Sequence, residues 1–324
     1  MVLVTGAGGF IGSHLVEALA AQGARVRAFV RYNSRGDEGL LRMLPAEQRA
    51  RVTVILGDLQ DSHAVARAME GCEVVFHLGA IIAIPYSYVH PRETIQVNVL
   101  GTLAVLEAAR QHRPTRVVHT STSEVYGTAR TERIAETHPL QGQSPYSASK
   151  IAADKIVESF HRAFDVPTVT VRPFNTYGPR QSLRAVIPTI IAQALTSDRI
   201  RLGSLAPIRD FTYVTDTVSG FLRAAEADGV LGREINLGAD NEISIGQLVD
   251  GVQKIVGSNL PIETDDQRVR PDKSEVMRLR SNNALARELL DWRPTVALGE
   301  GLRRTVEWAR GHLDLLGPAT GYRI

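Results

Sequence analysis

Runs of apolar residues alternate with amphipathic segments along the first half of the chain. Apolar runs of strand length predict strands at 2–5, 25–30, 52–56, 73–78, 116–121 and 168–172. Segments with apolar residues at helical spacing predict helices at 10–22, 62–69, 93–111 and 146–164. Strands that alternate with helices are typical of a parallel sheet covered on both faces and joined by right-handed crossovers. The pattern therefore predicts an α/β fold with a doubly wound parallel (Rossmann) sheet.

The second half of the chain is less regular. Prolines interrupt short helical segments after residue 173, and the stretch 261–294 is irregular and rich in arginine. One more strand is predicted at 234–237. We therefore expect a sheet domain formed by residues 1–176 plus about 211–240, and a smaller, mixed C-terminal lobe formed by about 177–210 and 241–324.

Composition and charge exclude several classes of partner. The 324 residues are 44% hydrophobic and 22% charged, with a formal net charge of +2, as in many soluble globular proteins. Acidic and basic residues are mixed along the chain, which argues against a nucleic-acid-binding stripe. The single cysteine, Cys72, excludes an intrachain disulfide and a multi-cysteine metal site. Because neither a leader nor an apolar segment of membrane-spanning length is present, we expect a cytoplasmic protein with no membrane, nucleic-acid or metal partner.

A glycine-rich loop follows the first predicted strand. The segment TGAGGFIG at 5–12 lies where this strand gives way to a helix, with glycines at every third position. Without side chains at these positions, backbone amides approach a pyrophosphate at the helix N-terminus. The loop therefore predicts dinucleotide binding, with contacts from Gly6, Gly9, Phe10, Ile11 and Gly12.

The second predicted strand ends without the acidic residue that usually holds the ribose 2′-hydroxyl of NAD. Val30 occupies that position and Arg31 follows it. A guanidinium here suits a 2′-phosphate, which modestly favours NADP over NAD, and stacking of Arg31 on adenine is the alternative. Asp58, just after the third strand, is predicted either to accept from the adenine amine or to cap a helix.

A tyrosine and a lysine stand four positions apart in the segment YSASK at 146–150. This spacing puts Tyr146 and Lys150 on the same face of the predicted helix. Between them and the glycine loop, Thr122 follows the end of the strand at 116–121. A tyrosine with an ordinary pKa of about 10 is a poor base at neutral pH, so we expect the lysine and a cationic nicotinamide to lower the pKa of Tyr146.

Several motifs occur in an order that is typical of a known family. They are TGAGGFIGSH (5–14), FHLGA (76–80), NVLGT (98–102), STSEVYG (121–127), YSASK (146–150), RPFNTYGPR (172–180) and RDFTYVTD (209–216). With these motifs the chain resembles, over nearly its whole length, the extended short-chain dehydrogenase/reductase family, specifically its nucleotide-sugar epimerases and dehydratases. The resemblance implies that the larger domain binds NAD(P) and that the C-terminal lobe binds a nucleotide sugar.

The resemblance also implies roles for single residues. Tyr146 would be the acid/base, Lys150 would bind the nicotinamide ribose, and Thr122 would hydrogen-bond the substrate hydroxyl. Further cofactor contacts are expected from Leu59, Leu78 and Ala80. Substrate contacts are expected from Tyr86, Asn175, Arg184, Arg209 and Arg270, where the arginines match diphosphate oxygens. A homodimer through the helix at 146–164 and the helix before residue 116 is implied as well.

Glu124 lies in STSEVYG, beside a row of hydroxyls at the end of a predicted strand. Sugar dehydratases usually read STDEVYG here, so Glu124 resembles their glutamate whereas Ser123 replaces their aspartate. Because a serine hydroxyl does not readily supply a proton to a leaving hydroxyl, we expect Glu124 both to remove the C5 proton and to protonate the C6 hydroxyl. The segments IAIPYSYV (82–89) and QGQSPYSASK (141–150) resemble those of dehydratases acting on nucleotide-linked N-acetylglucosamine, of the legionaminic-acid-pathway type.

The predicted function is therefore the 4,6-dehydration of UDP- or GDP-N-acetylglucosamine to a 4-keto-6-deoxy sugar. UDP-sugar 4-epimerase is one alternative. UDP-glucuronate decarboxylase is another, since it shares the STSEVYG motif, although it usually carries alanine at the position of Asp210. A non-catalytic NAD(P)-binding module is a remote alternative, against which the intact set of Thr122, Tyr146 and Lys150 argues.

Overall fold

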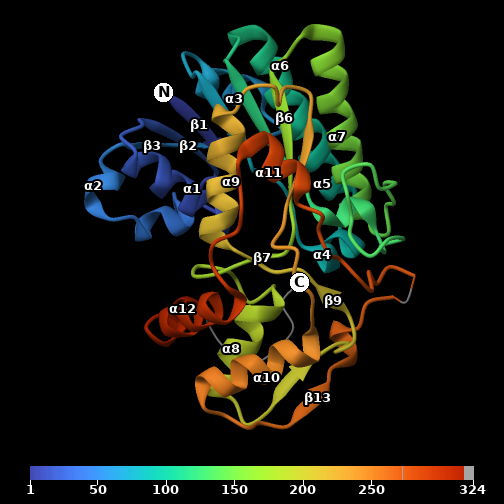
Figure 1. Ribbon diagram of the computed structural model, residues 1–324. Coiled ribbons are helices and arrows are strands. Elements are labelled where there is room, and N and C mark those ends of the chain that lie inside the picture. The colour runs from blue at the N-terminus through green and yellow to red at the C-terminus, as the bar shows by residue number, and fades with distance from the viewer. Residues whose placement is uncertain (272, 317–324) are drawn as a thin grey trace.

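The computed structural model describes residues 1–271 and 273–316 (Figure 1). Within this part of the chain, seven parallel strands form one sheet in the order β11-β6-β5-β4-β1-β2-β3. The strands are β1 (Val2–Thr5), β2 (Val26–Arg31), β3 (Val52–Gly57), β4 (Val74–His77), β5 (Arg116–Thr120), β6 (Thr168–Pro173) and β11 (Glu234–Leu237). The doubly wound α/β fold predicted from the sequence is confirmed.

Helices cover both faces of the sheet because side chains along each strand alternate between the two faces. On β1, Val4 belongs to one apolar cluster and Leu3 to the other. On the face of Val4, helices α1 (Phe10–Ala21) and α9 (Val214–Glu226) pack on the sheet and share its cluster. Those that share a cluster with Leu3 are α3 (Ser62–Met69), α6 (Gly101–His112) and α7 (Pro145–Phe164). Both faces are buried, which explains why the strands read as nearly continuous apolar runs.

A smaller lobe lies below the sheet in Figure 1. Its helices are α8 (Val186–Thr196), α10 (Ile245–Val256), α12 (Leu298–Arg310) and α13 (Leu313–Leu316). Short strand pairs accompany them: β7 (Thr176–Tyr177) with β10 (Thr212–Tyr213), β8 (Ile200–Leu202) with β13 (Ile262–Thr264), and β9 (Ile208–Arg209) with β12 (Ile243–Ser244). Ile190, Leu248 and Leu302 belong to the same cluster as Val4, so the core continues from the sheet into this lobe. The bounds of the two predicted domains stay a prediction.

Short helical segments connect these elements. They are α2 (Ala46–Arg49), α4 (Ile84–Val89), α5 (Pro91–Ile95) and α11 (Ala284–Leu290), together with the 3₁₀ segments η1 (Gly39–Met43), η3 (Ser123–Tyr126) and η4 (Asp266–Arg268). In the described part of the chain, no helix is long and apolar enough to cross a membrane.

The predicted helix at 93–111 differs from the observed one. The structure has α5, then a π-helical turn η2 (Gln96–Leu100), then α6. The side chain of Asn98 lies in this turn and donates to the carbonyl oxygen of Ile81 at 2.9 Å and to Ser149 Oγ at 2.9 Å. The extra residue of a π-turn turns Asn98 toward these partners, as is common near functional sites.

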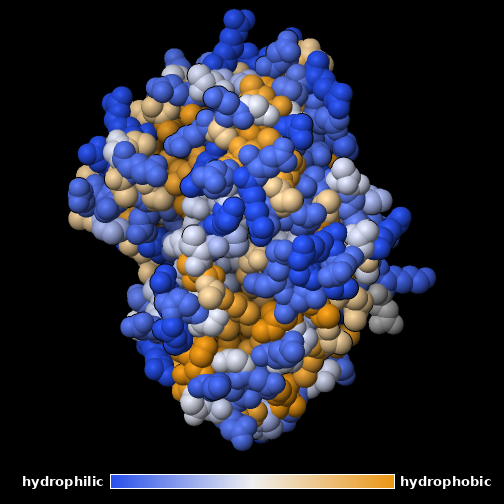
Figure 2. All heavy atoms as spheres, viewed as in Figure 1, coloured by the Kyte–Doolittle hydropathy of each residue, from blue (hydrophilic) through white to orange (hydrophobic). Residues whose placement is uncertain are grey.

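The surface seen in Figure 2 is mostly polar, with apolar atoms gathered between polar ones over the smaller lobe. In Figure 1 the same region holds α8, α10 and α12. The upper part of this face, over the sheet and its helices, shows more hydrophilic residues. On this face, apolar residues are therefore more concentrated over the smaller lobe.

Candidate active site

The glycine loop and the turn after β4 meet at the carboxyl ends of two neighbouring strands. Gly6 has a φ of +67°, and a Cβ built on it would lie 2.8 Å from the backbone nitrogen of Gly79. A Cβ on Gly12 would collide with the carbonyl oxygen of Gly6. Phe10 and Ile11 then open α1, whose N-terminus stands at the crevice between β1 and β4. This tight, side-chain-free loop fits the pyrophosphate of a dinucleotide.

The predicted cofactor residues after β3 and β4 lie together. A Cβ on Gly79 would be 2.6 Å from Leu59 Cδ1, so Leu59 packs directly on the turn that contains Leu78 and Ala80. The backbone amide of Leu78 donates to the carbonyl oxygen of Thr5 at 3.2 Å, which fastens this turn to the end of β1. The structure therefore brings these residues to the side of the glycine loop.

A chain of buried hydrogen bonds holds the turn after β4. Thr102 Oγ1 donates to the carbonyl oxygen of Asn98 at 2.7 Å, so it accepts from His77 Nε2 at 3.0 Å. His77 Nδ1 accepts from the Thr5 hydroxyl at 2.8 Å, and Thr5 Oγ1 accepts from the amide of Gly79 at 3.1 Å. Burial, followed by nearby positive charges, lowers the pKa of His77 well below its ordinary value. The imidazole of His77 is therefore neutral, as it must be for Nε2 to donate while Nδ1 accepts.

Arg31 and Asp58 lie at the carboxyl ends of β2 and β3. The side chain of Arg31 is 74% exposed, and its guanidinium lies 3.7 Å from the carboxylate of Glu93. Such an exposed pair contributes little to stability, so Arg31 is available to a ligand. Asp58 Oδ1 accepts from the amide of Gln60 at 2.9 Å, whereas Asp61 caps α3. The capping alternative for Asp58 is therefore wrong, because Asp58 stabilises the turn that precedes the helix.

Helix α7 delivers Tyr146 to the carboxyl edge of the sheet. The helix begins at Pro145 because Ser144 Oγ accepts from the amide of Ser147 at 3.1 Å, while Ser147 Oγ accepts from the amide of Ser144 at 2.9 Å. Tyr146 lies in the first turn, where the positive end of the helix dipole favours an anion. Its phenol lies near the side chain of Thr122, which follows the end of β5 and acts on the pKa of the phenol.

The protein's own groups do not lower the pKa of Tyr146. Burial raises it above its ordinary value, and the nearby side chain of Thr122 offsets only part of this effect. The negative charge of Glu124 raises it further. The cost of desolvating a phenolate therefore outweighs the stabilisation that these groups supply, and the lowering expected with a bound cationic nicotinamide stays a prediction.

Lys150 lies one helical turn after Tyr146 and is 3% exposed. Burial lowers the pKa of its ammonium to about 8, and the charge of Asp154 opposes this effect. Lys150 therefore remains a cation at neutral pH. Its Nζ donates to the carbonyl oxygen of Thr120 at 2.7 Å, which holds the ammonium at the end of β5.

Asp154, one further turn along α7, is the centre of a buried ion pair. Its Oδ2 accepts from Arg172 Nη2 at 3.0 Å and Nε at 3.2 Å, and from Ser121 Oγ at 2.8 Å. Its Oδ1 lies 3.3 Å from His119 Nε2. Burial alone would raise the pKa of this carboxyl, but the His119 hydrogen bond and the charges of Arg172 and Lys150 lower it to about 2. Asp154 is therefore ionised at neutral pH, one helical turn after Lys150.

Glu124 lies in η3, which Thr122 caps by accepting from the Glu124 amide at 3.2 Å. Burial dominates the pKa values of Tyr146 and Arg209, and the carboxylate of Glu124 acts on both. Glu124 is therefore within electrostatic range of the phenol and of the buried arginine. Ser123, in contrast, is 3% exposed and belongs to the buried side of η3.

Two predicted substrate arginines lie together around one carboxylate. Arg209 Nη2 is 3.1 Å from Glu275 Oε1, and Arg270 Nη1 is 3.6 Å from the same oxygen. Arg209 is 8% exposed and Arg270 is 27% exposed, so both cations are largely removed from water. Asn175 lies beside them, because its Nδ2 donates to the carbonyl oxygen of Asp210 at 3.3 Å. These side chains make a buried positive site of the kind that binds a diphosphate.

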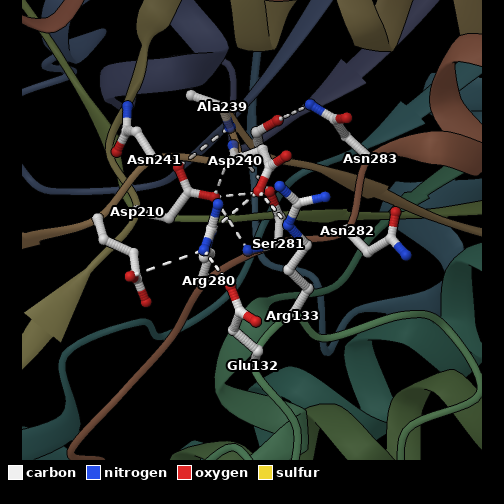
Figure 3. A network of polar contacts seen from close by, with 12 residues as sticks. Glu132, Arg133, Asp210, Ala239, Asp240, Asn241, Arg280, Ser281, Asn282 and Asn283 are labelled. Carbon is white, nitrogen blue, oxygen red and sulfur yellow. Dashed lines mark hydrogen bonds and ion pairs between the residues drawn. The ribbon is translucent and has the colours of Figure 1, made fainter.

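Asp210 holds this region through the network drawn in Figure 3. Its Oδ2 accepts from Ser281 Oγ at 2.6 Å and from the amide of Asp240 at 3.0 Å. Asp240 Oδ1 in turn pairs with Arg280 Nε at 3.0 Å and Arg133 Nε at 3.1 Å. Burial raises the pKa of Asp210, although these hydrogen bonds favour its carboxylate. The network ties β9 to the segments around residues 133, 240 and 281, which fixes the backbone next to Arg209.

Tyr86 is placed by its contact with Glu93, the carboxylate that also pairs with Arg31. The Tyr86 hydroxyl donates to Glu93 Oε2 at 2.5 Å, and this hydrogen bond raises the pKa of the phenol. The charge of Arg184 acts on Tyr86 in the opposite direction, which places the two side chains within electrostatic range. Arg184 itself is exposed.

A strap formed by residues 273–275 fastens the C-terminal part of the chain to the sheet domain. Ser274 Oγ donates to the carbonyl oxygen of Gln143 at 2.6 Å and lies 2.5 Å from the hydroxyl of Tyr88. Gln143 Nε2 donates to the carbonyl oxygen of Lys273 at 3.2 Å. The segments 82–89 and 141–150, which carry the resemblance to N-acetylglucosamine dehydratases, therefore meet at Ser274.

Sequence reasoning gave no role to Asp154, Asn98 or Glu275. For Asp154 a signal exists, since it continues the helical face of Tyr146 and Lys150 at the same spacing. For Glu275 there is none, because 66 positions separate it from Arg209. Among the described residues, no group of metal-ligating side chains is found.

Two sequence comparisons connect the chain with known proteins. Residues 3–305 match the family model described as GDP-mannose 4,6 dehydratase. The chain is 35% identical over 315 residues to a UDP-glucose 4-epimerase of Mycolicibacterium smegmatis, covering 95% of this chain and 98% of that protein. It is 31% identical over 325 residues to a dTDP-glucose 4,6-dehydratase of Xanthomonas campestris pv. campestris, covering 94% and 92%.

A solved structure agrees with these relatives. A dTDP-glucose 4,6-dehydratase of Streptomyces venezuelae, with NAD bound, superposes with a TM-score of 0.89 at 28% identity, covering 99% of this chain and 100% of that one. The fold, the glycine loop and the Thr122, Tyr146 and Lys150 set are thus accompanied by similarity along nearly the whole chain. The chain belongs to the family of GDP-mannose 4,6-dehydratase, within the NAD-dependent nucleotide-sugar epimerases and dehydratases of the extended short-chain dehydrogenase/reductases.

Proposed function

We propose that the protein is a nucleotide-sugar 4,6-dehydratase that converts UDP- or GDP-N-acetylglucosamine to the 4-keto-6-deoxy sugar. The observation that carries this proposal is the position of Glu124, a carboxylate within electrostatic range of the Tyr146 phenol. Simple hydride exchange at C4 needs an acid/base at O4 alone. A second proton-transferring group beside Tyr146 favours chemistry at the neighbouring carbons as well.

The first step takes place at C4 of the sugar. Tyr146 removes the proton of the 4-hydroxyl, and Thr122 holds that hydroxyl in place. A bound nicotinamide dinucleotide accepts the C4 hydride and returns it at the end of the reaction. Its cationic ring, together with Lys150 at the ribose, favours the phenolate that burial disfavours in the protein alone.

The second step removes water from C5 and C6. The 4-ketone acidifies the C5 hydrogen, which Glu124 takes as a proton. Glu124 then gives this proton to the C6 oxygen, the C6–O bond breaks, and water leaves. The hydride returns to C6 and a proton is added to C5, which balances the proton that Tyr146 removed. Ser123 is buried, and its hydroxyl does not readily supply a proton, so it is poorly suited to serve as the acid in place of the missing aspartate.

The proposed sugar rests on the segments 82–89 and 141–150, which resemble those of N-acetylglucosamine dehydratases. Support comes from Ser274, which joins both segments through Tyr88 and Gln143 beside the diphosphate arginines. Arg209 and Arg270 would hold the diphosphate, with Asn175 and the neighbouring Tyr86 and Arg184 on the sugar. The presence of Asp210 is accounted for by its structural hydrogen bonds, so it does not distinguish dehydratase from decarboxylase.

A second candidate is a UDP-sugar 4-epimerase. The observation in its favour is the 35% identity to a UDP-glucose 4-epimerase. Ser123 also favours it, because dehydratases usually carry an aspartate there. An epimerase would use Tyr146 in the same way but would leave Glu124 without a chemical step.

The cofactor is proposed to be NADP more than NAD, because Arg31 replaces the usual acid and remains exposed. NAD is the cofactor bound in the dehydratase of Streptomyces venezuelae, which is the argument for NAD. Both dinucleotides would bind the same glycine loop through their pyrophosphate. The preference for NAD or NADP therefore depends on the residues at the end of β2.

The test is to incubate the purified protein with UDP- and GDP-N-acetylglucosamine, UDP-glucose and UDP-glucuronate, and to weigh the products. Loss of one water from an N-acetylglucosamine substrate supports the proposal. An unchanged mass with inversion at C4, detected by NMR, supports the epimerase instead. Loss of carbon dioxide from UDP-glucuronate, or no reaction with any substrate, contradicts both.

A further inference from the structure

The carboxylate of Glu275 occupies the position between the two arginines that the proposed function assigns to the substrate diphosphate. One oxygen, Oε1, is shared by Arg209 at 3.1 Å and Arg270 at 3.6 Å. Glu275 is 17% exposed, so this contact is shielded from water and stronger than a surface ion pair. An anionic ligand at this place would therefore bind the same two guanidinium groups that Glu275 contacts.

The pairing is incomplete on the side of Arg270. Arg270 Nη1 is buried and finds no hydrogen-bond acceptor among residues 1–271 and 273–316, since 3.6 Å to Glu275 is too long. An N–H group buried in this way favours a ligand that supplies an additional oxygen. A diphosphate presents several oxygens, so it would satisfy both guanidinium groups where one carboxylate oxygen does not.

The segment that carries Glu275 is anchored independently of the two arginines. Ser274 fixes it to Gln143 and Tyr88, and Lys273 accepts from Gln143. In Figure 1 the chain between β13 and α11 rises along the side of the molecule from the smaller lobe to the sheet domain. Glu275 therefore stays next to the arginines whether or not its carboxylate contacts them.

We propose that Glu275 competes with the substrate diphosphate for Arg209 and Arg270. In this role it holds the two arginines in place and lowers the affinity of the site for the nucleotide. This inference rests on the proposed function for the identity of the ligand. Binding a diphosphate requires the Glu275 contact to break and brings like charges together. When the product leaves, the carboxylate returns to the arginines, which speeds release of the nucleotide sugar, a step that limits many enzymes.

The experiment compares anion binding to the full-length wild type and to Glu275→Gln by calorimetry at low ionic strength. Inorganic pyrophosphate is the probe, because it does not depend on the base or the sugar. Removing a negative charge at contact distance from the ligand should tighten binding about tenfold or more. The KM for the nucleotide sugar should fall while kcat is unchanged or lower, since product release slows.

The matched control is Glu242→Gln, which removes a carboxylate that pairs with Arg278 and Arg280 in the same part of the chain. It should leave pyrophosphate affinity unchanged. If Glu275→Gln does not fold, Glu275→Asp is the second variant, and its shortened carboxylate should also bind pyrophosphate more tightly than the wild type.

Each outcome decides one claim. Equal or weaker pyrophosphate binding to the variant overturns the inference, and if the wild type still dehydrates a nucleotide sugar, the proposed function stands. Tighter binding to the variant with no conversion of any nucleotide sugar sustains the competitor role and overturns the proposed function.

Discussion

Single side chains at the carboxyl edge of the sheet decide the chemistry of this site. The side chain of Thr122 and the charge of Glu124 act on Tyr146, and Lys150 donates to the carbonyl oxygen of Thr120. Burial raises the pKa of the phenol, so the protein's own groups favour the protonated form of Tyr146. In the proposed function a bound cationic nicotinamide would lower this pKa, which would couple the first proton transfer to cofactor binding.

A substitution of Arg31 tests the proposed preference for NADP over NAD. Replacing Arg31 with Gln removes the guanidinium proposed to face the 2′-phosphate, so NADP binding should weaken about tenfold or more, whereas NAD binding should change little. Fluorescence titration of both dinucleotides measures this ratio. Arg25→Gln, at the opposite end of β2, is the control and should change neither. A uniform loss for both dinucleotides would instead indicate stacking of Arg31 on adenine.

Helix α7 organises the site at the scale of elements. It carries Tyr146 in its first turn, Lys150 in its second and Asp154 in its third, all buried. Asp154 meets Arg172 of β6, so the helix is locked to the sheet by an ion pair rather than by apolar packing alone. The reactive groups are therefore positioned by a rigid support.

Asp154→Asn tests this support. Arg172 would keep its pair with Glu234 at 3.0 Å but would lose its buried anionic partner, so the free energy of unfolding should fall by about 1.5–3 kcal/mol at pH 7. Because the pKa of Asp154 is about 2, below the ordinary value of 3.8, its contribution is present above about pH 4 and is lost as pH falls toward 2. Urea denaturation at pH 7 and pH 3 should therefore show a smaller difference between variant and wild type at the lower pH.

The control for this measurement is Asp198→Asn, whose carboxylate pairs with Arg199 at the surface. It should leave the free energy of unfolding nearly unchanged. A cost for Asp154→Asn as small as this would show that the buried pair does not stabilise the fold.

The sequence predicted the elements better than the contacts between them. Seven strands were located from apolar runs because both faces of a parallel sheet are buried. The π-turn at η2 was missed, since its cause is the hydrogen bonding of Asn98 to Ile81 and Ser149, which are distant in the sequence. The spacing of apolar residues indicates which face of a helix is buried. It does not reveal the one extra residue that a π-turn inserts.

The candidate site shows the same division. The glycine loop, Thr122, Tyr146 and Lys150 were predicted because their spacing is local. The strong effect of burial on the Tyr146 pKa was not, because it depends on how much water the folded protein excludes. The pairing of Glu275 with Arg209 depends on a contact between distant segments, which no local pattern contains.

At the scale of the whole molecule, the exposed apolar residues suggest how two chains assemble. Val89, Ile95, Leu100 and Phe164 are between 43% and 58% exposed, and they lie on α4, α5, η2 and α7. The element α5 contacts α4 and η2, and all three contact α7, whereas Phe164, the last residue of α7, lies beside Arg110 of α6. We propose a homodimer through the surface of α7 and of the helices before residue 116, as the resemblance to the family implies.

Light scattering after gel filtration tests the dimer. The expected mass is that of two chains of 35.4 kDa each. Leu100→Glu would put a charge into the buried interface and should give the mass of one chain. Ile262→Glu, at a similarly exposed apolar residue of β13, is the control and should remain a dimer. A wild type with the mass of one chain contradicts the proposal.

The most direct test of the central claim, that Glu124 makes this enzyme a dehydratase, is the reaction of Glu124→Gln with UDP- or GDP-N-acetylglucosamine. We predict that the rate of water loss, measured by mass spectrometry, falls by about 10²–10⁴-fold. Oxidation at C4 should continue, so reduced nicotinamide should accumulate and its absorbance should rise. Conversion to the 4-keto-6-deoxy sugar at the wild-type rate would contradict it.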